Sequence, residues 1–194
     1  MSVLSTIFLA SANPHKIVEL EQILEPLGIK LTSTRNYHST EDVDEDQPTL
    51  EGNALKKARF WYRKTGLPSL ADDTGLEVDA LNGAPGVYSA RYAGEQAAYA
   101  DNVHKLLREL KGIQNRKAQF RTVIAFVNDE EEQIFEGICK GEIIREPRGE
   151  KGFGYDPVFL PKGFDKTFAE LSAKQKNLIS HRGLALQKFL NYLK

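Results

Sequence analysis

The sequence has a single cysteine, almost no net charge and no long apolar run, and each absence excludes a class of protein. Cys139 has no second cysteine with which to form an internal disulfide, so we expect a reducing, cytoplasmic setting. Lysine and arginine total 26 against 27 aspartate and glutamate residues, which argues against a protein that coats nucleic acid. No apolar stretch approaches the ~20 residues of a membrane-spanning helix. The N-terminus lacks the basic segment of a signal peptide and predicts a first strand instead.

The composition and the order of the predicted elements indicate one α/β domain over residues 1–194. About two-fifths of the residues are apolar, enough for a core, and no segment has the composition of a linker. A hairpin between two of the strands makes the sheet mixed and not strictly parallel. The predicted strands are 6–10, 30–33, 69–71, 119–127 and 134–139, and the predicted helices begin at Pro14, Leu50, Ala97, Ser172 and Ser180.

The stretch over residues 70–94 is the most unusual part of the chain. The apolar run Ser69–Ala71 predicts a buried strand, and Asp72 and Asp73 follow where we expect it to end, before a threonine–glycine pair. Adjacent strand residues point to opposite faces, so one aspartate is expected to face a site and the other to brace a loop. A carboxylate at a strand end is a common way to hold a divalent cation against a phosphorylated ligand. An ordinary turn explains the same residues, and the stretch alone leaves both interpretations open.

The segment after the first strand has the features of an anion site. Asn13 is a favoured N-cap and Pro14 suits the first helical position, so a helix is predicted to begin here. Free backbone N–H groups at such a start, together with Lys16, attract anions. The P-loop pattern is absent, and an ordinary helix start with a solvated lysine is the simpler interpretation of this segment by itself.

An acidic run over residues 41–46 precedes a helix for which Thr49 is the predicted cap. Negative charge is favourable before a helix, and such a run is usually a solvated loop. Lysines on this helix, Lys57 among them, are expected to be surface charges unless one of them reaches a phosphate.

Two further stretches near the C-terminus have features of a base-binding site. Gly149–Asp156 places aromatic rings between glycines, and such a ring can stack on a nucleobase with a contact of about 1–3 kcal/mol. A loop whose aromatics merely cover the core is the alternative. His181 and Arg182 are predicted in the first turn of the last helix, where cations oppose the helix dipole. Such a local conflict is expected at a functional site, although a surface pair also explains it.

Five motifs occur in order along the chain: Ser-Ala-Asn-Pro-His-Lys (11–16), Ala-Asp-Asp-Thr-Gly-Leu (71–76), Gly-Ala-Pro-Gly-Val-Tyr-Ser-Ala-Arg-Tyr (83–92), Gly-Phe-Gly-Tyr-Asp-Pro (152–157) and Ser-His-Arg-Gly (180–183). Together they resemble the inosine/xanthosine triphosphate pyrophosphatase family of house-cleaning enzymes. The resemblance implies an α/β fold with a mixed, elongated central sheet and flanking helices that form two lobes around a substrate cleft. It also implies a homodimer. The balanced charge and the short apolar runs predict neither nucleic-acid nor membrane partners. The implied reaction is Mg²⁺-dependent hydrolysis of ITP, dITP and XTP to the monophosphate and pyrophosphate.

The resemblance also assigns roles to individual residues. Asp73 matches the catalytic base and a metal ligand, and Glu45 matches the second metal ligand. The family's Glu-x-Gly lacks its glycine here, so Asp44 is the rival of Glu45. Thr74 stands where the family commonly has serine, and Ala12 where many members have glycine. The residues that match substrate contacts are Ser11, Ala12, Asn13, Pro14, His15, Lys16, Lys57, Thr74, Phe153, Gly154, Tyr155, Asp156, Lys176, His181 and Arg182.

The expected chemistry is attack of water on the α-phosphorus, with Asp73 orienting or deprotonating the water and lysines offsetting the charge that develops. A donor from His181 or Arg182 to the purine 6-keto oxygen would favour inosine and xanthosine over adenine. Guanine shares that oxygen, so its rejection requires another contact. The alternative function is a nucleotide-binding regulator that keeps the pocket and has no turnover.

Overall fold

The computed structural model describes residues 5–36, 41 and 43–193, without the side chains of His15, Glu19 and Ile23. The strands in this part of the chain are β1 (Thr6–Leu9), β2 (Lys30–Ser33), β3 (Ser69–Val78), β4 (Pro85–Gly86), β5 (Lys117–Val127), β6 (Glu132–Ile143) and β7 (Phe159–Pro161). The α-helices are α1 (Pro14–Leu24), α2 (Leu50–Thr65), α3 (Tyr99–Glu109), α4 (Ala173–Ile179) and α5 (His181–Tyr192). Short 3₁₀ helices cover Glu25–Leu27, Asp79–Leu81, Ser89–Arg91 and Asp156–Val158.

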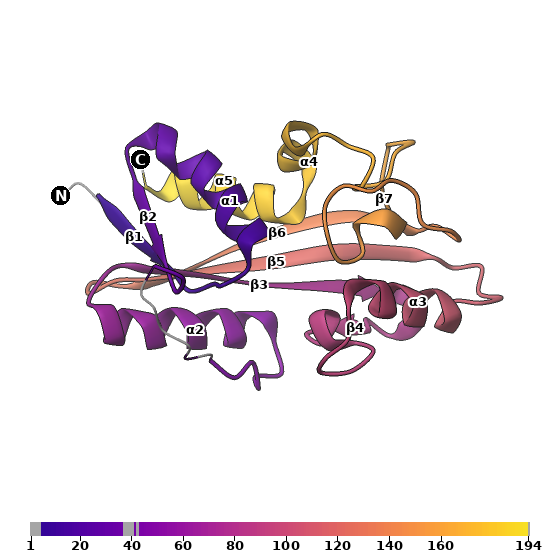
Figure 1. The fold of residues 1–194 in the computed structure, drawn as a ribbon, viewed down its shortest axis with the longest axis horizontal. Coiled ribbons are helices and arrows are strands. Elements are labelled where there is room, and N and C mark those ends of the chain that lie inside the picture. Colours follow the sequence, from indigo (N-terminus) through magenta and orange to yellow (C-terminus); the bar gives the residue numbers. More distant parts are fainter. Residues whose placement is uncertain (1–4, 37–40, 42, 194) are drawn as a thin grey trace. The chain divides into compact units, whose positions relative to one another are not determined.

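The strands form a mixed sheet in the order β2-β1-β3-β5-β6-β7, with β4 paired to β3 (Figure 1). β1 is parallel to β2 and to β3, whereas β4 is antiparallel to β3 and β7 is antiparallel to β6. The predicted α/β fold with a mixed sheet is therefore confirmed. The arrangement of two lobes around a cleft stays a prediction.

The chain divides into two compact units, each built from two separate segments. Unit 1 comprises residues 1–73 and 123–135, and unit 2 comprises residues 74–122 and 136–194. The chain passes from one unit to the other within β3, β5 and β6, so no linker segment marks a boundary. The predicted single domain over residues 1–194 remains a prediction.

The core of unit 1 forms where α2 packs on β1. Leu50, Ala54, Ala58 and Trp61 recur at helical spacing and are all buried, as their pattern predicts. Trp61 stacks on Phe8 of β1 with ring centroids 4.8 Å apart. The side chain of Thr49 accepts from the backbone N–H of Gly52, which confirms the predicted helix cap.

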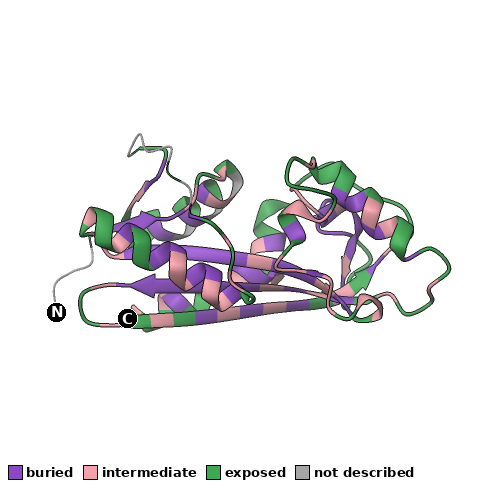
Figure 2. Cartoon of the chain, turned by 90° about the horizontal axis from the view of Figure 1, so that it is seen from below, coloured by how far each residue is buried: buried purple, intermediate pink, exposed green. Residues whose placement is uncertain are grey.

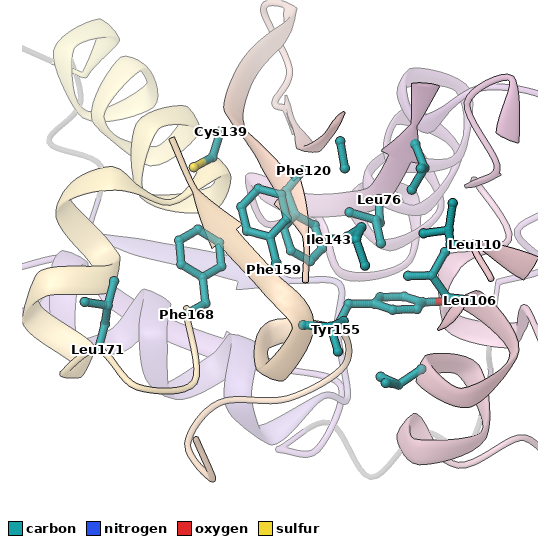
Figure 3. Close-up of a cluster of buried hydrophobic side chains, with 14 residues drawn as sticks. Leu76, Leu106, Leu110, Phe120, Cys139, Ile143, Tyr155, Phe159, Phe168 and Leu171 are labelled. Carbon is teal, nitrogen blue, oxygen red and sulfur yellow. The ribbon is translucent and has the colours of Figure 1, made fainter. Parts of the chain in front are cut away.

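The core of unit 2 is a cluster of aromatic and aliphatic side chains contributed by strands and helices (Figure 3). Phe120 of β5 contacts both Phe159 and Phe168, with ring centroids 4.7 Å and 5.9 Å away. Cys139 lies in this cluster, and burial raises the pKa of its thiol to about 11. A thiol with so high a pKa is mostly protonated near neutral pH and therefore unreactive.

β3 is longer than the sequence predicts. The strand was expected to end at Asp72 and Asp73, but it continues to Val78. It is buried over almost its whole length, with only Thr74 and Glu77 partly exposed. Figure 2 shows that buried residues extend along the strands of the sheet. A Cβ atom at Gly75 would lie 2.7 Å from the carbonyl oxygen of Gly86 in β4, so the glycine permits close pairing of the strands and does not form a turn. The turn interpretation of this motif is wrong, because pairing with β4 overrides local turn preference.

No helix in the part of the chain that the structure describes is long and apolar enough to span a membrane.

Candidate active site

A cluster of lysines and carboxylates lies in unit 1 around Asp72 and Asp73, both of which are buried. Asp72 Oδ1 lies 3.1 Å from Lys16 Nζ of α1, whereas Asp73 Oδ1 lies 3.5 Å from Lys57 Nζ of α2. The two adjacent aspartates thus face different lysines, as alternation along a strand predicts. They lie inside β3 and not at its end.

Lys57 connects the two proposed metal ligands. Its Nζ lies 2.5 Å from Glu45 Oε1 and 3.5 Å from Asp73 Oδ1, and it donates to the carbonyl oxygen of Asp72 at 2.8 Å. Asp44 contributes its backbone carbonyl oxygen, which accepts from Lys56. The structure therefore brings Glu45 into the same cluster as Asp73, which favours Glu45 over Asp44 as the second candidate ligand. Lys57 is buried and is not the surface charge that is usual for a helix lysine.

The ionisation of these groups depends on their mutual distances. Burial raises the pKa of Asp73, and the charge of Glu45 raises it further, while Lys57 opposes both effects. Burial alone would raise the pKa of Glu45, but the ammonium of Lys57 holds it below its ordinary value. The pKa of Lys57 is raised because the surrounding carboxylates outweigh its burial. Lys57 is therefore a permanent cation at neutral pH, and Asp73 holds its proton more tightly than an ordinary aspartate does.

These carboxylates fit a magnesium ion that is shared with a ligand better than a cage made by the protein alone. Among residues 5–36, 41 and 43–193, no group of three or more His, Cys, Asp or Glu side chains has the geometry to hold a metal ion. Mg²⁺ is usually held by one or two carboxylates together with water and substrate phosphates. Glu45 and Asp73, which share the ammonium of Lys57, supply that number of carboxylates.

The segment Ser11–Lys16 follows β1 at the edge where parallel strands end, the usual ligand-binding edge of such sheets. The side chain of Ser11 accepts from the backbone N–H of Asn13, and Asn13 Oδ1 accepts from that of Lys16. Pro14 begins α1, as predicted, and Ala12 is exposed. The side chain of His15 lies outside the described part of the structure.

A second cluster, in unit 2, surrounds the ring of Phe153. Lys176 Nζ lies 5.0 Å from the ring centroid and the guanidinium carbon of Arg182 lies 5.6 Å from it. Asp156 Oδ2 accepts from Lys176 Nζ at 2.7 Å and from the backbone N–H of Phe153 at 2.9 Å. A Cβ atom at Gly152 would lie 2.0 Å from Asp156 Oδ2, so this loop requires glycine there. The half-buried aromatic ring is thus held between fixed charges.

Gly154 and Tyr155 of the same loop differ in their surroundings, which are open at Gly154 and tightly packed around the ring of Tyr155. Gly154 has a φ of +60°, and a Cβ atom there would meet nothing within 4 Å. The ring of Tyr155 lies in the core of unit 2, and its hydroxyl donates to the carbonyl oxygen of Ser89 (Figure 3). The side chain of Tyr155 is therefore structural, and this position can offer only backbone groups to a ligand.

His181 and Arg182 begin α5, where Ser180 caps the helix by accepting from the backbone N–H of Gly183. Both side chains are buried, so the surface-pair interpretation is wrong. His181 stacks on Phe120 with ring centroids 4.4 Å apart. Arg182 donates to the hydroxyl of Thr74 at 3.4 Å. The surroundings of these two side chains are therefore built by the core of unit 2.

Four residues that contact the two clusters could not be identified from the sequence: Asn53 in unit 1, and Phe120, Thr122 and Gly137 in unit 2. Asn53 donates to Asp73 Oδ2, and the hydroxyls of Thr74 and Thr122 lie 2.7 Å apart. A Cβ atom at Gly137 of β6 would lie 2.0 Å from the carbonyl oxygen of His181. Two signals were present in the sequence: a polar residue within the apolar stripe of α2, and a glycine inside a predicted strand.

Within each unit the structure brings together most of the predicted residues. In unit 1 they are Ser11, Asn13, Lys16, Glu45, Lys57 and Asp73, and in unit 2 they are Thr74, Phe153, Asp156, Lys176, His181 and Arg182. Carboxylates with lysines at a parallel-strand edge, and an aromatic ring flanked by cations, together have the chemistry of an α/β protein that binds nucleotides.

Comparison with known families gives the particular class. The model of the Ham1 family matches residues 7–192, and the chain belongs to that family.

The curated relatives carry a common name. The dITP/XTP pyrophosphatase of Flavobacterium johnsoniae is 51% identical over 184 residues, which cover 95% of each chain. The dITP/XTP pyrophosphatase of Thermoanaerobacter pseudethanolicus is 48% identical over 189 residues, which cover 96% of each chain. These relatives confirm the family resemblance that the five motifs indicate.

Solved structures of the family share the fold. A Ham1 protein from Coxiella burnetii superposes with a TM-score of 0.90 at 44% identity, covering 97% of this chain and 98% of that chain. The Ham1 protein of Staphylococcus aureus superposes with a TM-score of 0.87 at 42% identity, covering 97% of this chain and all of that chain.

Proposed function

We propose that this protein hydrolyses non-canonical purine nucleoside triphosphates, namely ITP, dITP and XTP, to the monophosphate and pyrophosphate. The observation that carries the proposal is the cluster in which buried Lys57 joins Glu45 to buried Asp73 beside the segment Ser11–Lys16. The names of the curated relatives support the substrate class. Removal of such nucleotides from the precursor pool is the corresponding house-cleaning role.

The proposed reaction is a displacement at the α-phosphorus. A water oxygen forms a bond to the α-phosphorus, the bond from that atom to the bridging oxygen breaks, and pyrophosphate leaves. Asp73 accepts the proton of the attacking water, a task that suits a carboxylate whose pKa is raised by burial. Lys57, a permanent cation, offsets the negative charge that grows on the phosphate oxygens.

Glu45 and Asp73 would hold Mg²⁺ in this scheme. When bound, the ion would neutralise phosphate charge and polarise the water. Lys16 at the start of α1 would bind the phosphates, since an anion is stabilised at a helix N-terminus.

Base selection is proposed for the cluster around Phe153. The ring offers a face on which a purine can stack. Arg182, or His181 at the same helix start, would donate to the 6-keto oxygen of hypoxanthine or xanthine. Adenine has an amino group at that position, and two donors left facing each other cost about 1–3 kcal/mol for each unpaired group.

Hydrolysis of ITP in ¹⁸O-labelled water tests the reaction directly. We expect inosine monophosphate that carries the label, together with unlabelled pyrophosphate, because the water attacks the α-phosphorus. Label in the pyrophosphate would place the attack on the β-phosphorus, and release of orthophosphate would place it on the γ-phosphorus. Tight binding of ITP without any product would instead support the alternative of a nucleotide-binding regulator.

A further inference from the structure

Asn53 is a fully buried polar residue in the first turns of α2, with 0% of its surface exposed. Asparagine is a poor residue for a helix interior, and a buried amide is costly unless both of its ends are hydrogen-bonded. Both ends of Asn53 are satisfied. Nδ2 donates to Asp73 Oδ2 at 3.1 Å, and Oδ1 accepts from the backbone N–H of Gln47 at 2.9 Å.

The partners fix the orientation of this amide. Gln47 offers an N–H group, which must meet the oxygen of Asn53, and the carboxylate of Asp73 must then meet the nitrogen. A flipped amide would place oxygen against carboxylate and N–H against N–H. Asn53 therefore links the strand that carries Asp73 to the segment that precedes α2, with its amide in a single orientation.

That segment carries the second candidate metal ligand. Glu45 lies two residues before Gln47 and contacts Lys57 one helical turn after Asn53. The segment packs tightly on the helix, since a Cβ atom at Gly52 would lie 2.8 Å from the Cβ of Gln47. Asn53 and Lys57, four residues apart on one face of α2, thus hold different oxygens of Asp73 and also secure the segment that bears Glu45.

We propose that Asn53 is a positioning residue that holds Asp73 and the segment bearing Glu45 in the arrangement required for metal binding, before any metal or nucleotide is present. The inference rests on the proposed function, in which these two carboxylates bind Mg²⁺. Hydrogen-bond partners of metal ligands commonly contribute a factor of about 10–100 to metal affinity or activity. Asn53 is a direct hydrogen-bond partner of Asp73, and it acts on Glu45 through the backbone of the segment that contains both Glu45 and Gln47.

The chain contains a matched control in Asn102. It is the fourth residue of α3, as Asn53 is the fourth residue of α2, and it is also buried, with 1% exposed. Its amide bonds only to backbone groups, donating to the carbonyl of Ala90 at 3.0 Å and accepting from the N–H of Ala93 at 2.7 Å. Replacement of either asparagine removes the same kind of structural bonds, but only Asn53 contacts a candidate metal ligand.

The test measures Mn²⁺ affinity of the nucleotide-free protein by electron paramagnetic resonance, together with kcat and KM for ITP. We expect Asn53→Ala to bind Mn²⁺ about 10- to 100-fold more weakly and to lose kcat, with little change in KM at saturating metal. Asn102→Ala should lower the melting temperature but keep the wild-type metal affinity. Asn53→Leu, which keeps the branched shape of the side chain, provides the same measurement if the alanine variant does not fold.

Wild-type affinity in a folded Asn53 variant, with normal binding by the parent protein, would overturn this inference alone. Equal weakening in Asn102→Ala would also overturn it, because the effect would then be a general loss of stability. Failure of the parent protein to bind Mn²⁺ without nucleotide would overturn this inference. If chelation also left the activity unchanged, the metal assignment of the proposed function would be overturned with it.

Discussion

At the scale of single residues, Asp73 has a proposed catalytic role and lies in a buried environment that disfavours its ionised form. Burial raises the pKa of its carboxyl above the ordinary value of 3.8. The folded state therefore binds this proton more tightly than the unfolded state does, and the free energy of unfolding falls as the pH rises through the interval between the two pKa values. Above that interval, the ionised carboxylate that serves as the proposed base lowers the free energy of unfolding.

Asp73→Asn should therefore lower kcat for ITP by about 10²–10⁴-fold, since a general base is lost. The same variant should be more stable than the parent protein near pH 7, and the gain should shrink as the pH is lowered toward the ordinary pKa of aspartate. Urea denaturation at a series of pH values measures the stability. A variant with near-normal turnover, or one that is less stable at neutral pH, would contradict this account of Asp73.

The pair formed by Lys176 and Asp156 is buried on both sides, with 9% and 4% of the side chains exposed. Lys176→Met removes the cation that faces the buried carboxylate of Asp156, and we expect a loss of about 3–5 kcal/mol in unfolding free energy. The double variant Lys176→Met/Asp156→Asn should recover part of that loss. Lys56→Met breaks the pair with exposed Asp46 and is the control, expected to cost much less because water screens that carboxylate. Equal losses in the two single variants would show that burial does not decide the effect.

Sequence reasoning at this scale identified the residues with obvious chemistry and missed those that support them. Asp73 and Arg182 are charged residues within recognisable motifs, whereas Lys57 was assigned through the family resemblance. Asn53 and Phe120 belong to no motif, and their importance depends on contacts with residues far away in the chain. Such contacts are tertiary and leave only a weak mark on local sequence.

At the scale of elements, the packing of α5 on β6 depends on a close approach of their backbones. A Cβ atom at Gly137 of β6 would lie 2.0 Å from the carbonyl oxygen of His181 and 2.5 Å from the backbone nitrogen of Ala185. A side chain at this glycine would force the start of α5 away from the strand. His181 and Arg182 lie at that start, so their positions depend on the glycine.

Gly137→Ala should lower the unfolding free energy by at least about 1–3 kcal/mol, as overpacking does, and should also reduce the preference for ITP over ATP in kcat/KM. Gly141→Ala is the matched control on the same strand, because its Cβ would meet the carbonyl oxygen of Leu160 in β7 at 2.3 Å. It should cost stability while leaving base preference unchanged. Loss of preference in both variants would show that base selection depends on stability in general and not on the position of α5.

The elements themselves were largely predictable, because helix caps and hydrophobic periodicity are local signals. Thr49 and Ser180 cap helices as expected, and the hairpin between β5 and β6 lies where the acidic turn predicts it. β3 was not predictable over its full length, since Asp72–Gly75 favours a turn when considered alone. Its extension depends on pairing with β4 and on burial, neither of which is visible in the local sequence.

At the scale of the whole molecule, the identity of the substrate is the central claim. The chain belongs to the Ham1 family, and we propose that its two clusters of functional residues serve the phosphates and the base of a non-canonical purine nucleotide. The homodimer implied by the resemblance to the inosine/xanthosine triphosphate pyrophosphatases also remains a proposal, which sedimentation against the 21.8 kDa mass of one chain would test.

Pyrophosphate release from ITP, dITP and XTP, compared with ATP, dATP, GTP and dGTP with and without Mg²⁺, tests this claim most directly. We predict rapid, magnesium-dependent release from the first three nucleotides and release slower by at least about tenfold from ATP and dATP, since unpaired buried donors oppose adenine. GTP and dGTP share the 6-keto oxygen with ITP, so slower release from them requires a separate contact that opposes the guanine 2-amino group. Equal kcat/KM for ITP and ATP would contradict the account of base selection. Orthophosphate in place of pyrophosphate would contradict the reaction itself.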